Sequence, residues 1–250
     1  MEILRVNELS LNFGGLQVLQ NISFSIKEGE KVALIGPNGA GKTTILNVLN
    51  GLIPPLSGRI NLLGHDITRQ PTHARASLGL HRSFQVSSLF PRLSVLSNVL
   101  VALHGIRKTS YQMIRPITSY KDDLNKANEL LESVDLLPRQ NIYAQSLSHG
   151  EQRRLEIILA LAFHPKALLL DEPTAGLTSS ESSVLAQMLR SPSNKDISVL
   201  FVAHDLDLVF EVAERILVLY YGRIIAEGTP EQIQTNQSVR EVYLGEKRNA

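Results

Sequence analysis

Residues 36–43 read Gly36-Pro37-Asn38-Gly39-Ala40-Gly41-Lys42-Thr43 and follow a compact, mostly apolar run at 31–35. The octet fits the pattern G-x-x-x-x-G-K-[ST], in which glycines let consecutive backbone N–H groups turn around a polyphosphate. The apolar residues of 45–49 recur at helical spacing, so a helix is expected to begin at Lys42 and to end near Gly51. A buried strand, this loop and a helix start together predict a phosphate-binding site.

The chemistry expected of this loop is the binding of a phosphate chain together with magnesium. The helix start adds its partial positive charge to the backbone N–H groups of the loop. Lys42 is predicted to reach the β and γ phosphates, and Thr43 to hold Mg²⁺ through its hydroxyl. The residues predicted to contact the nucleotide here are Gly36, Asn38, Gly39, Ala40, Gly41, Lys42, Thr43 and Thr44.

A second candidate site lies at the end of the apolar run Leu168-Leu169-Leu170-Asp171-Glu172. A strand that ends in two carboxylates places them at the carboxyl edge of a parallel sheet, where ligands bind. Asp171 is predicted to bind the Mg²⁺ shell, and Glu172 to polarise a water molecule. The second carboxylate favours hydrolysis. A P-loop kinase of small molecules is the disfavoured alternative, and its activity would depend on an acceptor.

The rest of the chain places these two sites in an α/β fold. Residues 3–13 and 16–26 are rich in alternating apolar side chains and flank a glycine pair, which predicts an antiparallel hairpin. From about 94 to 163 the apolar residues recur at helical spacing. Strands and helices alternate again from 167 to 219, which predicts right-handed crossovers and a parallel sheet.

We predict one domain over residues 1–250, in which a helical insert at about 86–164 interrupts an α/β core of 1–85 and 165–250. A chain of 250 residues can bury a substantial core. Its 25 Lys and Arg against 24 Asp and Glu give a net charge of +1, so no nucleic-acid partner is expected. The sequence contains no cysteine, which excludes a disulfide framework, a zinc–thiolate site and a cysteine nucleophile.

Two further observations concern membranes. No apolar run approaches the roughly 18 residues that a membrane span needs, and residues 1–5 lack the pattern of a signal peptide. The stretch 64–92 holds Arg69, Arg75, Arg82 and Arg92 against a single carboxylate, with three histidines interspersed. An ordinary solvated face is the favoured interpretation of this stretch. Contact with anionic head groups or with a partner loop is the alternative.

The segment Leu147-Ser148-His149-Gly150-Glu151-Gln152 resembles the signature of ATP-binding cassette (ABC) ATPases, usually Leu-Ser-Gly-Gly-Gln. The resemblance spans nearly the whole chain. It implies a P-loop NTPase (RecA-like) α/β core with a parallel sheet, an N-terminal antiparallel β subdomain and a helical insert. It also implies ATP and Mg²⁺ as cofactors, and a dimer in which Ser148 and Gly150 of one chain complete the ATP site of the other.

The same resemblance implies roles for three residues outside the loop and the signature. Gln85 stands at the position of the family's catalytic and metal-binding glutamine, His204 at that of its catalytic switch histidine, and Phe13 where an aromatic ring lies against adenine. Each has a structural alternative when taken alone: Phe13 fits a core aromatic, His204 a strand-end histidine and Gln85 a solvated loop residue. Ser148 fits a helix N-cap, although a helix N-terminus is also an anion site.

The sequence departs from the family pattern in two places. His149 replaces the first signature glycine, and Glu151 takes the usual glutamine position. The backbone cradle is expected to survive because Gly150 remains. Thr178 stands where the family commonly has an aspartate, so the effect of its missing carboxylate on communication between subunits stays open.

Several segments resemble, more narrowly, the importer ATPases for branched-chain amino acids. They include Phe13-Gly14-Gly15-Leu16, Glu151-Gln152-Arg153-Arg154-Leu155-Glu156 and Ala226-Glu227-Gly228-Thr229-Pro230. Urea and short-amide importers share much of this pattern, and so does the ATPase of the lipopolysaccharide exporter. A soluble ABC ATPase of DNA repair or translation is the alternative of a different class. Repair forms carry a very long coiled-coil insert and translation factors carry two cassettes, and neither fits 250 residues.

The narrower resemblance also implies partners and a location. The expected partners are transmembrane permease subunits, a second ATPase subunit in a homo- or heterodimer and, indirectly, a periplasmic or extracellular substrate-binding protein. The expected location is the cytoplasmic face of the cell membrane, as a peripheral protein. The cargo is selected by the binding protein and the membrane subunits, so it rests on analogy alone.

Overall fold

The computed structural model describes residues 1–82, 89–105 and 121–246 of the chain. Its contacts divide the chain into two compact units. The first comprises Met1–Arg82, Lys166–Pro173 and Pro192–Ala250, and the second comprises Ser83–Pro165 and Thr174–Ser191. The second unit therefore joins the helical stretch to residues that follow the two predicted carboxylates. A single domain with an insert at 86–164 stays a prediction.

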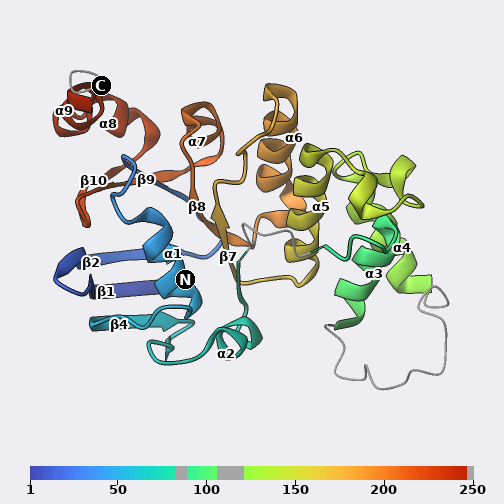
Figure 1. The fold of residues 1–250 in the computed structure, drawn as a ribbon, viewed down its shortest axis with the longest axis horizontal. Helices are drawn as coiled ribbons and strands as arrows, with labels where there is room; N and C mark the ends of the chain where they lie inside the picture. Colours follow the sequence, from blue (N-terminus) through green and yellow to red (C-terminus); the bar gives the residue numbers. More distant parts are fainter. Residues whose placement is uncertain (83–88, 106–120, 247–250) are drawn as a thin grey trace. The chain divides into compact units, whose positions relative to one another are not determined.

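One sheet of the first unit is antiparallel and is built on the predicted hairpin. Strand β1 (Glu2–Phe13) pairs with β2 (Leu16–Lys27) across a two-residue turn. Strand β4 (Ser57–Leu62) pairs with β1 and β5 (His65–Asp66) with β4, which gives the order β2-β1-β4-β5. Figure 1 shows β1, β2 and β4 as neighbouring strands. The predicted hairpin is confirmed, and the short strands β4 and β5 extend it.

The other sheet of the first unit has six strands, which run in the order β10-β9-β3-β8-β7-β6. The strands are β3 (Lys31–Ile35), β6 (Leu80–Arg82), β7 (Ala167–Asp171), β8 (Ser198–Val202), β9 (Arg215–Tyr220) and β10 (Arg223–Gly228). All pairings are parallel except that of β10 with β9. Every residue of β3, β7 and β8 is buried, as in central parallel strands. The predicted α/β core with a parallel sheet is confirmed.

The helices of the first unit are short, and the end of α1 is set by a glycine. Helix α1 begins at Lys42 and ends at Asn50, where Gly51 adopts a φ of 82°. That left-handed glycine is a common helix terminator, and the predicted helix is confirmed. Helix α7 lies within the stretch 167–219, where alternating strands and helices were predicted. The helices described here are α1 (Lys42–Asn50), α2 (Thr72–Ser77), α7 (Leu206–Val212), α8 (Pro230–Thr235) and α9 (Gln237–Glu246).

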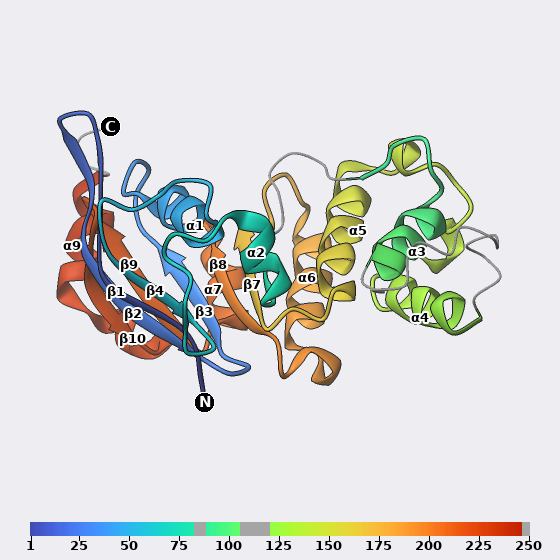
Figure 2. The ribbon, with the colours of Figure 1, turned by 90° about the horizontal axis from the view of Figure 1, so that it is seen from below.

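The second unit is helical. Its helices are α3 (Val95–Gly105), α4 (Lys121–Glu132), α5 (His149–Ala162) and α6 (Ser179–Arg190), with 3₁₀ turns at Leu137–Arg139 and Ala144–Ser146. Figure 2 shows α5 beside α6, as Figure 1 does. The buried faces follow the predicted helical spacing, with Val95, Val99, Leu131 and Leu155 fully buried. None of the described helices is long and apolar enough to cross a membrane.

The interpretation of 64–92 as a solvated basic face is wrong for two of its arginines. Arg75 is only 1% exposed, and the Arg82 side chain only 6%. Both bond to groups inside the first unit, whereas Arg69 and Arg92 are exposed. A run of charges in a sequence does not show which of them meet a buried partner.

Candidate nucleotide-binding site

The loop between β3 and α1 is shaped for a ligand with many acceptor oxygens. Gly41 is the N-cap of α1, with a φ of 106°, and it offers no side chain to the first N–H groups of the helix. Gly39 has a φ of 77°, and a Cβ placed there would meet no atom within 4 Å. Asn38 and Gly39 are exposed, whereas Gly36 and Ala40 are buried. The loop is therefore anchored at Gly36 and Ala40 and open at its tip, as phosphate binding requires.

Lys42 places its ammonium group inside this loop. The residue is 6% exposed, and Nζ donates to the carbonyl oxygens of Gly36 at 2.7 Å and Pro37 at 2.8 Å. A buried cation with carbonyl partners on one loop is held in position for an anion on the same loop. Thr43 and Thr44, the next two residues of α1, are half-buried.

Asp171 faces the start of α1 from the end of β7. It is 1% exposed, and its Oδ1 lies 3.4 Å from the hydroxyl oxygen of Thr43. Its Oδ2 accepts a hydrogen bond from Nη2 of Arg82 at 2.8 Å. The hydroxyl and the carboxylate are oxygen ligands of the kind that Mg²⁺ prefers, so this donor set fits the metal.

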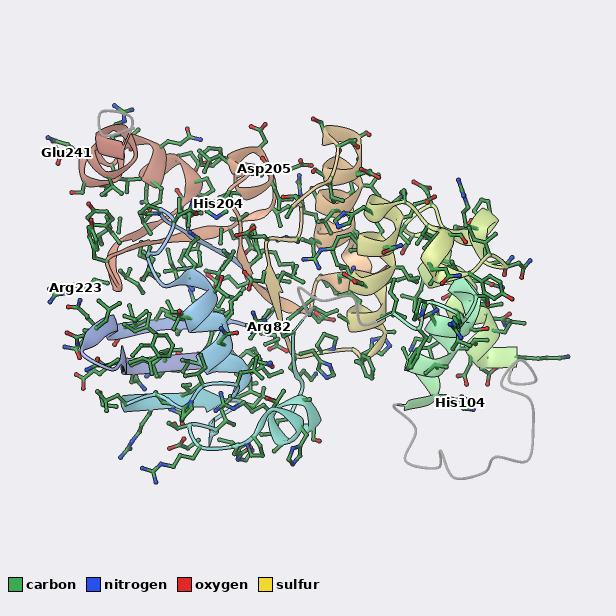
Figure 3. All side chains as sticks on the ribbon, viewed as in Figure 1. Arg82, His104, His204, Asp205, Arg223 and Glu241 are labelled. Carbon is green, nitrogen blue, oxygen red and sulfur yellow. The ribbon has the colours of Figure 1, made fainter. Side chains whose placement is uncertain are left out.

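Glu172 and His204 meet at the carboxyl ends of two adjacent parallel strands. Glu172 follows β7 and His204 follows β8, and β7 pairs with β8. His204 Nε2 lies 3.2 Å from Glu172 Oε1, with the two side chains 46% and 37% exposed. Figure 3 labels His204 beyond the end of β8. Glu172 has a φ of 47°, which is rare for a residue with a side chain and is found disproportionately at active sites.

The remaining predicted residues of the first unit have less defined surroundings. Phe13 ends β1 and is 50% exposed, so it is not the core aromatic of the alternative interpretation. An exposed ring is available to stack on a base. Gln85 lies outside the described residues, so its predicted catalytic and metal-binding roles stay predictions.

The second unit holds the signature segment at a helix start. Ser148 is the N-cap of α5, its hydroxyl accepts from the Glu151 N–H, and the Glu151 carboxylate accepts from the Ser148 N–H. The glutamate that departs from the family pattern thus completes a capping box. The capping alternative for Ser148 is confirmed, and the anion site at the same helix end stays a prediction.

The segment that contains Thr178 packs on the signature helix within the second unit. Thr178 caps α6 in a second capping box with Glu181. The Thr178 N–H donates to the Glu181 carboxylate and, with the Thr178 hydroxyl, lowers the pKa of Glu181. A Cβ on Gly150 would lie 1.9 Å from Glu181 Oε1, and one on Gly176 would lie 3.3 Å from the His149 ring. A side chain at position 150 would therefore displace the Glu181 carboxylate from its capping box.

Two family profiles of known proteins match this chain. A family profile described as "ABC transporter" matches residues 19–175, which is more than half of the chain. The chain belongs to the ABC transporter family. A second profile, described as "Branched-chain amino acid ATP-binding cassette transporter", matches residues 223–248 of this ABC protein.

Full-length relatives support this assignment. The chain is 38% identical over 250 residues to the high-affinity branched-chain amino acid transport ATP-binding protein LivG of Salmonella typhimurium, with 98% of each chain covered. It is 36% identical over 246 residues to the lipopolysaccharide export system ATP-binding protein LptB of Escherichia coli, with 98% of each chain covered.

Solved ABC structures agree with the fold. The ADP conformation of the cassette MJ1267 has a TM-score of 0.84 at 30% identity, covering 98% of this chain and 99% of that one. A dimeric post-hydrolysis state of the cassette MJ0796, bound to ADP and Pi, has a TM-score of 0.73 at 26% identity, covering 91% and 99%. The chain is thus an ATP-binding subunit of an ABC transporter, an ATPase that dimerises and works with permease subunits.

Proposed function

We propose that Glu172 is the general base of ATP hydrolysis in this ABC subunit and that His204 holds it in place. The observation that carries the proposal is the 3.2 Å contact between the two side chains at the carboxyl ends of β7 and β8. A carboxylate there can accept a proton from an attacking water. The imidazole restrains the carboxylate and is itself exposed enough to contact the terminal phosphate. The unusual backbone of Glu172 supports a position set by function.

The phosphates of ATP would be held by the start of α1 and its loop. The backbone N–H groups of residues 39–43 and the Lys42 ammonium would bind them, and Phe13 would contact the adenine. Thr43 and Asp171 would hold Mg²⁺, with Gln85 as a further ligand. Bound Mg²⁺ supplies charge neutralisation at the β and γ phosphates. A single carboxylate together with phosphate oxygens is the usual protein site for this ion.

The signature segment would serve the site of a second subunit. Ser148 and Gly150 open α5, and a helix start with a serine hydroxyl is suited to a phosphate group. Each composite site would then take its phosphate loop from one chain and its signature segment from the other, in a homo- or heterodimer. Thr178 stands in the loop that the family uses between subunits. Its capping box gives that loop a fixed helix start without the usual aspartate.

We further propose that the transporter imports branched-chain or other amino acids. The support is the second family profile at residues 223–248 and the identity of 38% to LivG. The partners would be transmembrane permease subunits and, indirectly, a periplasmic or extracellular substrate-binding protein. The subunit would lie on the cytoplasmic face of the membrane. Lipopolysaccharide export is the second candidate, because LptB is 36% identical over the whole chain, and urea or amide import is a third.

Glu172→Gln tests the catalytic assignment. Because the amide cannot accept the proton, we expect turnover to fall by about 10² to 10⁴ fold while ATP still binds. Phosphate release and nucleotide binding are measured on the same preparation. Glu211→Gln removes the same charge from an exposed position on α7 and is expected to leave turnover unchanged. Normal turnover by Glu172→Gln would contradict the proposal.

The cargo is tested in reconstituted vesicles. The subunit is combined with the membrane subunits that co-purify with it, and uptake of labelled leucine is compared with uptake of labelled urea. ATP-dependent leucine uptake supports the amino-acid assignment. Urea uptake, or copurification with lipopolysaccharide-binding membrane subunits, would replace it with one of the alternatives.

A further inference from the structure

We propose that Arg82 is an internal counter-ion of Asp171 that competes with the divalent cation for this carboxylate and so weakens metal binding. The proposal rests on the proposed role of Asp171 as a metal ligand and adds a residue that sets its affinity. Arg82 is a positioning residue here, because it acts on the site through Asp171.

The ion pair is closed to solvent. Arg82 Nη2 donates to Asp171 Oδ2 at 2.8 Å, with the side chains 6% and 0% exposed. The other carboxylate oxygen faces the Thr43 hydroxyl at 3.4 Å. Since surrounding water screens a buried pair much less than an exposed one, the guanidinium charge acts strongly on Asp171.

A second contact fixes where that charge lies. Arg82 Nη1 donates to Asn47 Oδ1 at 2.5 Å. Asn47 follows Thr43 by four residues on α1, so both side chains leave the same face of the helix. The guanidinium therefore bridges α1 and β7 and stays beside the proposed metal ligands. Arg82 is the last residue of β6 and is labelled in Figure 3.

Arg75 shows what a purely structural buried arginine looks like in the same unit. Its Nε donates to the Gln70 carbonyl, its Nη1 to those of Val48 and Leu49, and its Nη2 to that of Thr68. Every nitrogen is used, and the partners include the last carbonyls of α1. Arg82, by contrast, pairs with a carboxylate, and its Nε has no hydrogen-bond partner among the described residues. The charge of Asp171 explains the position of Arg82 better than hydrogen bonding to backbone carbonyl groups does.

The competition follows from the charges. A buried carboxylate needs compensating charge and hydrogen bonds, and Arg82 contributes a positive charge at 2.8 Å from Asp171. A divalent cation that approaches Asp171 meets a carboxylate whose charge is already compensated, and it is repelled by the guanidinium nearby. Removal of the Arg82 charge is therefore expected to increase the affinity of the site for Mg²⁺ and to make folding depend on the ion.

The experiment compares Arg82→Met with wild type in two measurements on the full chain. Thermal unfolding is followed without nucleotide while MgCl₂ is titrated, and the Mg²⁺ dependence of ATP hydrolysis is followed at saturating ATP. Arg82→Met is expected to unfold at a lower temperature without Mg²⁺ and to regain roughly 4 °C or more at saturating Mg²⁺, with little response from wild type. The Mg²⁺ concentration that gives half-maximal hydrolysis is expected to fall about tenfold. A factor of this size corresponds to removing one competing charge-assisted contact from Asp171.

Two controls separate charge from structure. Arg82→Lys keeps the charge and is expected to resemble wild type in its response to Mg²⁺. Arg75→Met removes a buried arginine from the other end of α1 and is expected to lower the unfolding temperature with no recovery in Mg²⁺. Arg82→Gln keeps a hydrogen-bond donor without the charge and replaces Arg82→Met if the latter does not fold.

The outcomes distinguish this proposal from the metal assignment. An unchanged or increased Mg²⁺ requirement in Arg82→Met, or recovery of Arg75→Met by Mg²⁺, would overturn the role of Arg82. Asp171→Asn tests the ligand itself: if it leaves the Mg²⁺ dependence of hydrolysis unchanged, the metal assignment of the proposed function fails. If Asp171→Asn changes that dependence and Arg82→Met does not, only the present inference fails.

Discussion

Helices α1 and α5 both start at a predicted phosphate site, but the two starts are finished in opposite ways. The N-cap of α1 is a glycine without a side-chain hydrogen bond, and the loop before it follows the fully buried strand β3. The N-cap of α5 is Ser148, which forms a reciprocal capping box with Glu151. The first start leaves its N–H groups to a ligand, whereas the second satisfies one of them internally. At α1 a bound ligand would itself satisfy the N–H groups of the helix start. At α5 a side chain of the same chain already satisfies one of them.

The largest effect expected from this comparison is that of Gly36→Ala. A Cβ on Gly36 would lie 2.1 Å from the carbonyl oxygen of Leu219, a backbone atom that cannot move aside. We expect a loss of about 3 kcal/mol or more in the free energy of unfolding, measured by denaturant titration. Gly39→Ala is the matched control. Its Cβ meets no atom, so only the strain of its positive φ remains, at about 1 to 2 kcal/mol.

Equal losses in the two glycine variants would show that the loop is not anchored at Gly36. They would also remove the distinction between the anchored but uncapped start of α1 and the capped start of α5. A larger loss in Gly39→Ala would contradict the open tip of the loop.

The next effect concerns binding rather than folding. Lys42→Ala removes a charged hydrogen bond worth roughly 1.5 to 3 kcal/mol, so ATP affinity is expected to fall about ten- to a hundredfold. Calorimetric or fluorescence titration with ATP measures it. Lys31 is also buried, but its Nζ donates to the carbonyls of Gly29, Asn194 and Ile197, away from the loop. Lys31→Met is therefore expected to lower stability and to preserve ATP affinity. Unchanged binding by Lys42→Ala would refute the phosphate loop.

The smallest effect tests the capped helix starts of the second unit. Thr178→Ala removes the N-cap of α6 and is expected to cost about 1 kcal/mol of stability. Thr178→Asp restores the residue that the family commonly carries and is expected to match wild type within about 0.5 kcal/mol, because aspartate caps as well as threonine. Both are measured by denaturant unfolding. A large loss in Thr178→Asp would mean that the threonine hydroxyl has a role beyond capping.

Much of the fold was predictable because its signals are local. The hairpin, the central strands and α1 follow from alternation, apolar runs and the glycine loop. The neighbouring positions of Glu172 and His204 follow from a general rule, since adjacent parallel strands end at the same edge. The family resemblance added what spacing alone does not indicate, such as the predicted role of Ser148 in the site of a second subunit.

The parts that were missed depend on contacts between distant residues. Strand β6 has three residues, too few to show a period. Arg75 and Arg82 look alike in sequence, and only their different partners, carbonyls and a carboxylate, separate them. The packing of Glu181 on Gly150 joins segments about thirty residues apart, so no sequence pattern marks it. Such contacts decide how the site is tuned rather than which fold forms.

The backbone of Glu172 has an evolutionary consequence. Because φ is 47° at this position, any residue other than glycine lowers the stability of the folded state by roughly 1 to 2 kcal/mol. Selection for a robust chain alone would therefore drive the position toward glycine, and a drifting, non-functional copy of the sequence would lose its carboxylate early. The carboxylate at this bend therefore carries a conformational cost that glycine would avoid, which is the expected price of placing a general base there.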